Sequence, residues 1–588
     1  MIPDPYRKNM LTAAGVFAVI FSFCLPLKFA GLTAISEAAG FFPETVSSYL
    51  LITFPAHSAG VFSALLLLLT IMALPDADLK KNCLVPAILW SIVWVAATLP
   101  GFSGSGADPD IAMGEFANAA GIAAWSASLW LLFSNDPHWG KWCAEAFFAG
   151  MLITALYGYW QYFAGFEEIR KFVAEEQSKG VILSDAMRHK LADTRIFSFA
   201  ASSNALAGLL LSVLPVGCFF AFRRGTQFKP QKISRMIFIA STVLIISGAL
   251  ILTRSRSVVF CLGCAALLAL FSAPRIAGKW KITAAIFVLL LGIGTMIFAI
   301  HFGRGTASMT ERLDYLRTCS ILTAENPLSG GGWGSFFYRH MEIKLSSTDE
   351  AARDPHNTIA AFAAQSGIFA AIAVTAILLV PLAMLWKERF SGFRGAVFWS
   401  GVLFTFHSLT DCDIHIPAQM FFAAMIYAAA LAERDPERSK FTVSPALIPA
   451  LLLAVLSLAA NIHWLRGEKA LADLTEKIHP SSQLSVMRYA GESVAGLAEK
   501  AANIRPASAL VPEMAGDWYF KRGDIFSAEK YYRRALELNP CRPGIYIRMA
   551  NVENMRNNSE QAKIYRSKAA HRFPRKYGRP DHFSPSSK

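Results

Sequence analysis

The sequence predicts an all-α fold: a polytopic integral membrane bundle of about 12–13 transmembrane helices, followed by a smaller helical domain. Of the 588 residues, 54% are hydrophobic and only 17% are charged, and the mean hydropathy is +0.39. Apolar stretches of roughly 18–25 residues recur with short polar gaps, which is the pattern of helices that cross a membrane. A membrane β-barrel would show only short alternating segments, so that class is excluded.

About thirteen apolar segments form the expected bundle. The first of them has no A-x-A-like cleavage end, so we expect it to be an uncleaved span rather than a signal peptide. The expected spans lie near residues 10–32, 49–74, 83–101, 112–134, 143–165, 199–222, 236–253, 257–273, 282–301, 358–386, 395–410, 416–432 and 443–464.

The distribution of lysine and arginine predicts the orientation of the bundle. The basic tail YRKN (6–9) favours a cytoplasmic N-terminus, and alternation of the spans then puts the short basic loops on the same side. The same loops account for the formal charge of +14, so nucleic acid is not an expected partner. An odd number of spans sends the C-terminal region to the opposite, periplasmic face. The basic loops are residues 79–82, 223–235, 274–281, 386–394 and 433–440.

Some arginines depart from this trend because they fall on the outer side. The turn TRSRS (253–257) carries Arg254 and Arg256, and the long loop 302–357 carries Arg312 and Arg317 among others. The turn contains no acid, whereas the loop does. A guanidinium binds phosphate oxygens in pairs and keeps its proton, so these arginines are candidates for a diphosphate site. Ion pairing within the folded loop is the competing interpretation, and its partners would be Glu311, Asp314, Glu325 and Glu342.

The last part of the chain, residues 466–588, loses the apolar runs and shows an internal repeat. Two sets of residues recur at a spacing of 34: Pro506, Pro540 and Pro574, and Ala501, Ala535 and Ala569. Segment 509–542 resembles a tetratricopeptide repeat, in which small residues let paired helices approach and a proline ends the second helix. We therefore expect two domains: residues 1–465 in the membrane, and a periplasmic tetratricopeptide-like scaffold at 466–588 that binds a protein partner.

The long outer loop ends in a glycine cluster and a histidine–asparagine pair. The segment NPLSGGGWGSF (326–336) includes Gly331 and Gly332, which let the backbone approach a ligand closely. His356 and Asn357 follow in DPHNTIAAFAAQSGIF and enter an apolar run. Together with the arginines, these segments resemble the O-antigen ligase family (Wzy/WaaL-like glycan ligases and polymerases) over roughly residues 195–435. The match departs at Ala370, where the family pattern has a second glycine.

The resemblance implies a GT-C-like membrane glycosyltransferase in the bacterial inner membrane, with chemistry on the periplasmic side. The donor would be a glycan on undecaprenyl diphosphate. Arg256, helped by Arg254, Arg317 and Arg312, would bind the diphosphate and stabilise the leaving charge. His356 would orient or deprotonate the acceptor hydroxyl, because an imidazole titrates near working pH. Displacement at the anomeric carbon would invert its configuration. Asn357, Gly331 and Gly332 would line the same site.

The late segment HSLTDCDIHIPAQ (407–419) resembles the family's penultimate outer loop. Asp411 and Asp413 form a D-x-D, which holds a metal in other glycosyltransferases. Such triplets are common, so we favour acceptor contacts or polar packing for Asp413 and His415, and we expect no metal and no cofactor.

Three acceptors are open: a lipid A–core sugar, another lipid-linked repeat unit, or a protein serine or threonine. Each offers a hydroxyl, so the site chemistry does not separate ligase, polymerase and protein O-oligosaccharyltransferase. A transporter or flippase is the alternative of another class, but transporters bury functional charges near the bilayer midplane. A purely structural scaffold would not explain the arginines and histidine of the long loop.

Overall fold

The structure is a computed structural model in which every regular element of the described residues is a helix. The described residues are 4–31, 46, 53–73, 89–104, 106, 108–178, 193–225, 232–274, 277–283, 285–286, 306–345, 352–411, 413–432, 444–480 and 483–578. Five of the described helices are long and apolar enough to cross a membrane: Tyr6–Lys28, Pro109–Asn135, Ser203–Arg223, Ile368–Glu388 and Ile448–Ile478. The all-α, multi-pass membrane fold expected from the sequence is therefore confirmed.

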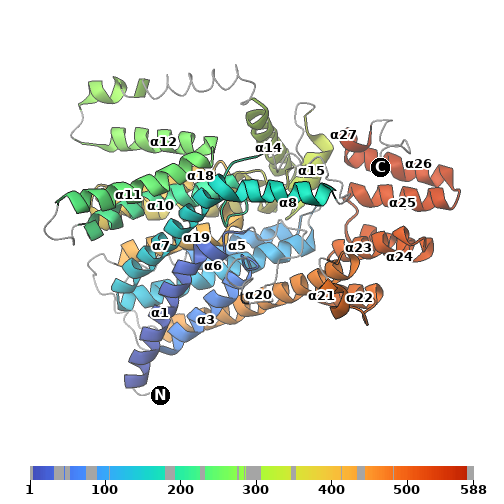
Figure 1. The fold of residues 1–588 in the computed structure, drawn as a ribbon, viewed down its shortest axis with the longest axis horizontal. Coiled ribbons are helices and arrows are strands. Elements are labelled where there is room, and N and C mark those ends of the chain that lie inside the picture. The colour runs from blue at the N-terminus through green and yellow to red at the C-terminus, as the bar shows by residue number, and fades with distance from the viewer. Residues whose placement is uncertain are drawn as a thin grey trace.

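The helices form an elongated body with a stack of shorter helices at one end (Figure 1). Those of the body are α1 (Asp4–Lys28), α3 (Ser58–Ala73), η1 (Leu89–Val93), α5 (Trp94–Thr98), η2 (Leu99–Phe102), α6 (Pro109–Asn135), α7 (His138–Trp160), η3 (Gln161–Gly165), α8 (Phe166–Ser178), α10 (Ser203–Gly225), α11 (Lys232–Leu252), α12 (Arg256–Ser272), α14 (Thr306–Glu325), α15 (Ser335–Ile343), α16 (Thr358–Ser366), α17 (Ile368–Leu385), η4 (Trp386–Glu388), α18 (Gly392–Ser408), η5 (Asp413–His415) and α19 (Pro417–Ala432). Helix α20 (Ser444–Ile478) leads to α21 (Gln483–Arg488), α22 (Val494–Ile504), α23 (Leu510–Lys521), α24 (Ile525–Leu538), α25 (Pro543–Met555), α26 (Ser559–Arg572) and α27 (Pro574–Tyr577).

The expected spans agree with the helices to different degrees. Those at 10–32, 112–134, 199–222 and 443–464 each coincide with a helix of membrane-crossing length. Shorter apolar helices stand at five further places: Ser58–Ala73, Ser91–Phe102, Ile239–Leu252, Arg256–Ser272 and Pro417–Ala432. The expected span at 282–301 lies almost wholly outside the described residues. The total of about 12–13 spans, and the side on which each end lies, stay predictions.

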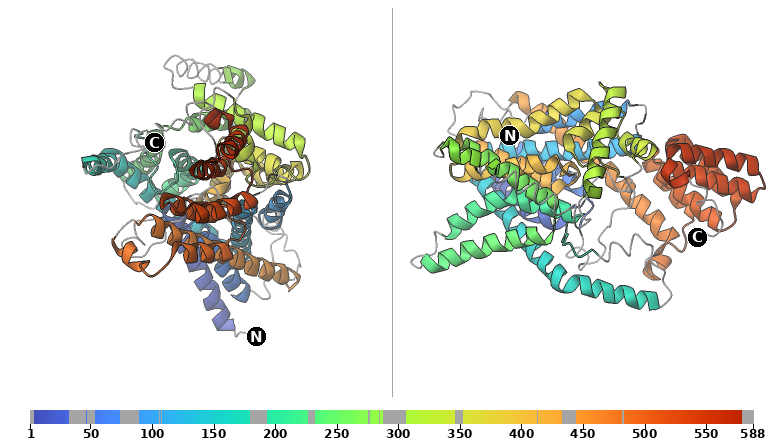
Figure 2. Two further views of the ribbon diagram at one scale, coloured as in Figure 1. Left: turned by 90° about the vertical axis from the view of Figure 1, so that its right-hand side faces the viewer. Right: turned by 90° about the horizontal axis from the view of Figure 1, so that it is seen from above.

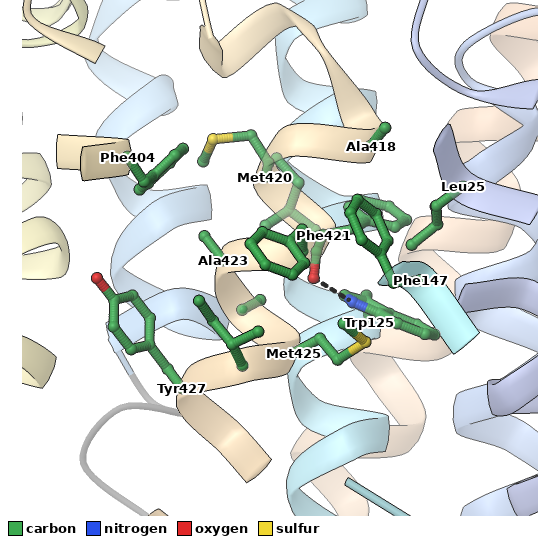
Figure 3. Close-up of a cluster of buried hydrophobic side chains, with 14 of the residues drawn as sticks. Leu25, Trp125, Phe147, Phe404, Ala418, Met420, Phe421, Ala423, Met425 and Tyr427 are labelled. Atoms are coloured by element: carbon green, nitrogen blue, oxygen red, sulfur yellow. Dashed lines mark hydrogen bonds between the residues drawn. The ribbon is translucent and has the colours of Figure 1, made fainter. Parts of the chain in front are cut away.

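The core of the body is packed around α6 and α19, which are buried along nearly their whole length. Trp125 of α6 stacks on Phe421 of α19 and donates its indole N–H to the Phe421 carbonyl oxygen at 2.9 Å (Figure 3). A buried indole needs such a partner, since its unsatisfied N–H would be costly in an apolar interior. This contact fixes the mutual register of the two helices. The segment that ends at His415 comes directly before α19, so its position follows from that of the helix.

The expected span at 358–386 is not one helix, so that prediction is wrong. The chain breaks at Gly367, which has φ +89° and separates α16 from α17. At this point the backbone of Leu328 comes so close that a Cβ on Gly367 would lie 2.1 Å from its carbonyl oxygen. The Ile368 N–H donates to the Pro327 carbonyl oxygen at 2.9 Å, which holds the approach together. A tertiary contact thus ends α16, and only α17 has membrane-crossing length.

Small residues also bring α3, α6 and α20 into close contact. A Cβ on Gly60 would lie 2.4 Å from the Asn461 side chain, and one on Gly121 would lie 2.8 Å from the Cα of Gly60. Asn461 uses the space to donate its amide to the Ala117 carbonyl oxygen at 2.9 Å. Such small-residue crossings are typical of helices packed in membranes, where dispersion and hydrogen bonds replace the hydrophobic effect.

The C-terminal helices pack in consecutive pairs, α23 with α24 and α25 with α26, beyond one end of the body (Figure 2). Small residues allow this pairing: a Cβ on Gly516 would lie 2.6 Å from the Tyr532 ring. Asn539 donates both to Asp108 Oδ2 at 2.8 Å and to the Tyr338 hydroxyl at 2.9 Å, which ties the stack to the body. The domain boundary near residue 465 falls inside the continuous helix α20. The tetratricopeptide assignment and the proposed protein partner stay predictions.

Replacing Gly121 by valine should destabilise the body, because the new side chain would meet the backbone of α3. Overpacking of this kind costs about 1–3 kcal/mol, so the melting temperature of the purified protein should fall by about 1–3 °C. Gly491→Val is the matched control, since no atom lies within 4 Å of a Cβ at that position. Equal melting temperatures for both variants would contradict the close packing described here.

Candidate functional site

The candidate site is organised by the segment between α18 and α19, which supplies carboxylates and imidazoles to three other parts of the chain. Asp411 lies 2.8 Å from His356 Nδ1, Asp413 lies 2.8 Å from His407 Nδ1, and His415 Nε2 lies 3.0 Å from Asp354 Oδ2. All these side chains are buried except that of His356, which is 29% exposed. The sequence motif that resembled a family loop is thus the structural hub of the site.

His356 is held in a backbone conformation that bulky residues rarely adopt, with φ +53°. The Asp354 carboxylate accepts the His356 backbone N–H at 2.7 Å. The next residue, Asn357, caps α16 by accepting the Ala360 N–H at 2.9 Å and donates to the Leu409 carbonyl oxygen at 3.0 Å. A residue in the left-handed region persists only where its surroundings impose it, and strain of this kind concentrates at functional sites.

The environment of the His356 side chain favours its protonated form. Burial lowers the pKa, but the hydrogen bond and charge of Asp411, with the charge of Asp354, outweigh it and raise the pKa above its ordinary value. Since Asp411 engages Nδ1, a neutral His356 carries its proton there and leaves Nε2 as the basic nitrogen. The Tyr315 ring packs at 5.9 Å from the imidazole and restricts its rotation.

The turn between α11 and α12 joins the site through a serine. Ser257 Oγ lies 3.4 Å from His407 Nε2 and 2.7 Å from Ser255 Oγ. Arg254 and Arg256 flank these buried serines and are themselves exposed, and Arg254 has φ +50°. The turn therefore buries its serines against α18 while both guanidinium groups remain at the surface.

The two arginines of α14 have different environments. Arg317 is 43% exposed at its side chain and donates to Asp314 Oδ1 at 3.2 Å and to the Ile343 carbonyl oxygen at 3.0 Å. For Arg317 the ion-pair interpretation therefore describes the structure. Arg312 is half-buried, makes no ion pair with a described residue, and is close enough to His356 to oppose its protonation. Arg312 is thus the loop arginine best placed to meet an anion beside the histidine.

The glycine cluster serves the packing of the loop. The N–H groups of Gly331 and Gly332 donate to the carbonyl oxygens of Ala364 and Gln365, at 2.8 and 3.2 Å. On its other side the loop meets the residues before α6, where the Gly106 N–H donates to the Gly331 carbonyl oxygen at 2.9 Å. Both glycine N–H groups are engaged inside the protein, so the cluster supports the site by fixing the end of α16.

A second histidine lies deeper than His356. His415 Nδ1 lies 3.2 Å from Glu115 of α6, and its Nε2 faces Asp354. Burial lowers the pKa of His415, but the two carboxylates outweigh it and raise the pKa to about 10. The two carboxylates therefore favour the protonated imidazolium form of His415. Because Asp354 contacts both this imidazolium and the backbone of His356, it couples the two histidines.

The carboxylates of the D-x-D point to different histidines, Asp411 to His356 and Asp413 to His407. Within the described ranges, no group of three or more His, Cys, Asp or Glu side chains is arranged to hold a metal ion.

Two members of the site are not singled out by the sequence. Glu115 and Ser257 reach their histidines from positions distant along the chain, and no local spacing indicates such pairs. The D-x-D triplet does point to Asp411, but not to its contact with His356. Asp354 does have a local signal, since an aspartate two residues before another residue commonly accepts its backbone N–H.

One family comparison covers part of this arrangement, without the segment between α18 and α19. Residues 240–375 match the model of the Wzy_C family, described as O-antigen ligase. The match includes the turn with Arg254 and Arg256, helix α14, and His356, but it is narrower than the resemblance over 195–435. No curated protein matches the chain. The match and the apolar helices together support a multi-pass membrane protein with an O-antigen ligase domain.

Replacing Asp411 by asparagine should lower the pKa of His356, because the negative charge that stabilises the imidazolium is lost. Diethyl pyrocarbonate reacts with the neutral imidazole, so the midpoint of its reaction at His356 should move to lower pH in the variant. Mass spectrometry of peptides modified at a series of pH values measures this midpoint. His138, which is 79% exposed, is the internal control and should keep its midpoint. An unchanged midpoint at His356 would contradict the role of Asp411.

Proposed function

From the O-antigen ligase domain and the setting of His356, we propose that the protein is a membrane glycosyltransferase. It transfers a glycan from undecaprenyl diphosphate to an acceptor hydroxyl on the periplasmic side of the inner membrane. The observation that carries the proposal is a strained, partly exposed histidine whose Nδ1 is bound by a buried aspartate, which leaves Nε2 to accept a proton. This pairing is the usual arrangement of a general base and its orienting carboxylate.

In the proposed reaction, the acceptor oxygen attacks the anomeric carbon of the donor glycan. Its proton passes to His356 Nε2, and the bond between the anomeric carbon and the diphosphate oxygen breaks. Undecaprenyl diphosphate leaves with the bonding electrons, and the anomeric configuration inverts. Asp411 stabilises the imidazolium that forms. Asp354 acts as a positioning residue because it accepts the backbone N–H of His356, and Asn357 does so by capping α16 and donating to the Leu409 carbonyl oxygen.

Arginines are proposed to bind the diphosphate. Arg256 and Arg254 are exposed on a turn whose serine contacts His407, and Arg312 is near His356. A permanently charged guanidinium would both bind phosphate oxygens and stabilise the charge that develops as the diphosphate leaves. Arg317 is already engaged by Asp314 and Ile343, so we assign it a supporting role in this site. The mechanism requires no metal.

Three acceptors remain within the proposal: a lipid A–core sugar, a lipid-linked repeat unit, and a protein serine or threonine. All present a hydroxyl to His356. Comparison of lipopolysaccharide, free polymer and glycoproteins by mass analysis in a deletion strain separates them.

Replacing His356 by alanine should lower the transfer rate by about 10²–10⁴-fold, since the general base is removed. Asp411→Asn should retain part of the rate and move the acidic limb of the pH profile to lower pH, because the pKa of His356 falls. Transfer of a labelled undecaprenyl-diphosphate glycan in proteoliposomes measures both effects. His138→Ala is the matched control and should act as the parental protein does. Parental rates in His356→Ala would refute the assignment.

The proposed orientation places the C-terminal helices in the periplasm. Alkaline phosphatase fused after residue 578 should therefore be active, because the enzyme needs periplasmic oxidation to fold. A fusion within the basic loop 386–394 should be inactive. Activity in the second fusion and none in the first would invert the topology and remove the periplasmic site.

A further inference from the structure

A cavity lies where the C-terminal helices meet the body. The empty space between its walls, counted out to the open solvent, is about 750 Å³. The body contributes residues of α6 and of the loop before α15, and the C-terminal side contributes the turn between α22 and α23. The cavity does not include His356 or Arg256, so it is distinct from the proposed diphosphate site.

The cavity nevertheless adjoins the proposed base. Asp354 lines it and accepts the backbone N–H of His356 with its Oδ1. His415 and Glu115 line it as well, and His415 lies 3.0 Å from Asp354 and 3.2 Å from Glu115. A ligand in the cavity would therefore contact Asp354, which in turn binds the backbone of His356, the residue proposed to take the acceptor's proton.

The lining combines aromatic rings with many polar groups. Trp333, Phe337, Tyr338 and Trp464 contribute rings, and Asp108, Asp110, Glu115 and Asp354 contribute carboxylates. Rings that stack on C–H faces, together with carboxylates that accept hydrogen bonds from hydroxyl groups, suit a carbohydrate. Such a ligand presents many hydroxyl groups and no charge that needs neutralising.

The arginines of the lining do not make it an anion site. Arg505 is paired with Asp110, and Arg542 is paired with Glu513 at 2.6 Å. The Arg353 guanidinium lies 5.4 Å from the Phe337 ring centroid. Positive charge from Arg505 and Arg542 is thus compensated locally, which disfavours a phosphate as the main ligand and leaves hydroxyl recognition as the better fit.

A buried hydroxyl on the C-terminal side supports a ligand of this kind. Ser508 is only 2% exposed, its Oγ has no hydrogen-bond partner within the described part of the chain, and it lines the cavity. An unpaired buried hydroxyl is costly, and a ligand that hydrogen-bonds to it would remove that cost. Ser508 lies in the turn between α22 and α23, outside the region that matches the ligase family.

We infer that this cavity binds the acceptor glycan and that the C-terminal helices form one wall of the acceptor site. The inference rests on the proposed transferase function and extends it to the class of acceptor, a carbohydrate rather than a peptide. It also gives the C-terminal helices a role in substrate binding, whereas the sequence led us to expect only that they bind a protein partner.

Filling the cavity tests the inference. Ser508→Trp in the full-length protein should weaken binding of an uncharged lipopolysaccharide core oligosaccharide, free of lipid, phosphate and acidic sugars, by about ten-fold or more. Binding of inorganic diphosphate should change by less than about two-fold, because the arginine site is separate. Calorimetry with protein in nanodiscs measures both constants. Phe337→Ala, which opens the wall instead of filling it, should also weaken oligosaccharide binding and guards against misfolding of the first variant.

The control is Ser559→Trp, the same change at an exposed position on α26, which should leave both binding constants unchanged. Failure of the parental protein to bind the oligosaccharide would overturn the inference, as would binding at the parental level by both cavity variants. Binding of a serine- and threonine-rich peptide that Ser508→Trp abolishes would replace the glycan by a peptide acceptor. Specific oligosaccharide binding without any glycan transfer would retain the cavity and reject the transferase function.

Discussion

The position of one imidazole depends on two aspartates that come from opposite sides of it. Asp354 precedes His356 and binds its backbone, and Asp411 arrives from the end of α18 and binds its ring. The two contacts hold a histidine at φ +53°, a conformation that costs on the order of 1–3 kcal/mol. They join the loop before α16 to the segment after α18. The proton affinity and the orientation of the histidine follow from the same two bonds.

The glycines around this centre serve the docking. The turn at Gly330–Gly334 passes between the start of α6 and the end of α16, and a Cβ on Gly330 would lie 2.4 Å from the backbone of Gln365. Gly367 permits the approach of Leu328 on the next turn of chain. These contacts make α16 a short, separately anchored helix, so His356 is fixed by the outer loop rather than by a long membrane helix.

Much of the architecture follows from patterns that lie close together in the sequence. Apolar runs predict α6, α10 and α20, and an asparagine before such a run predicts the cap of α16, because these features depend on neighbouring residues. The pairing of Arg339 with Glu325 and Glu342 is likewise one of the ion pairs that the composition of the loop suggests.

The remainder depends on contacts between distant segments. The break at Gly367 is imposed by Leu328, and the hydrogen bond between His356 and Asp411 joins residues 55 positions apart. The length and polarity of an apolar run can be read from the sequence. The part of the chain that will pack against it cannot. The same limit hides the cavity at Ser508, whose walls come from parts of the chain between Asp108 and Arg542 that are far apart in sequence.

Helix α20 is longer than the hydrocarbon core of a bilayer is thick. Its 35 residues make a rod of about 52 Å, whereas the hydrocarbon core of a bilayer is about 30 Å thick. About 22 Å of uninterrupted helix is therefore available to lift the C-terminal stack clear of the lipid tails. The length of one helix thus sets how far the C-terminal helices can stand from the lipid tails.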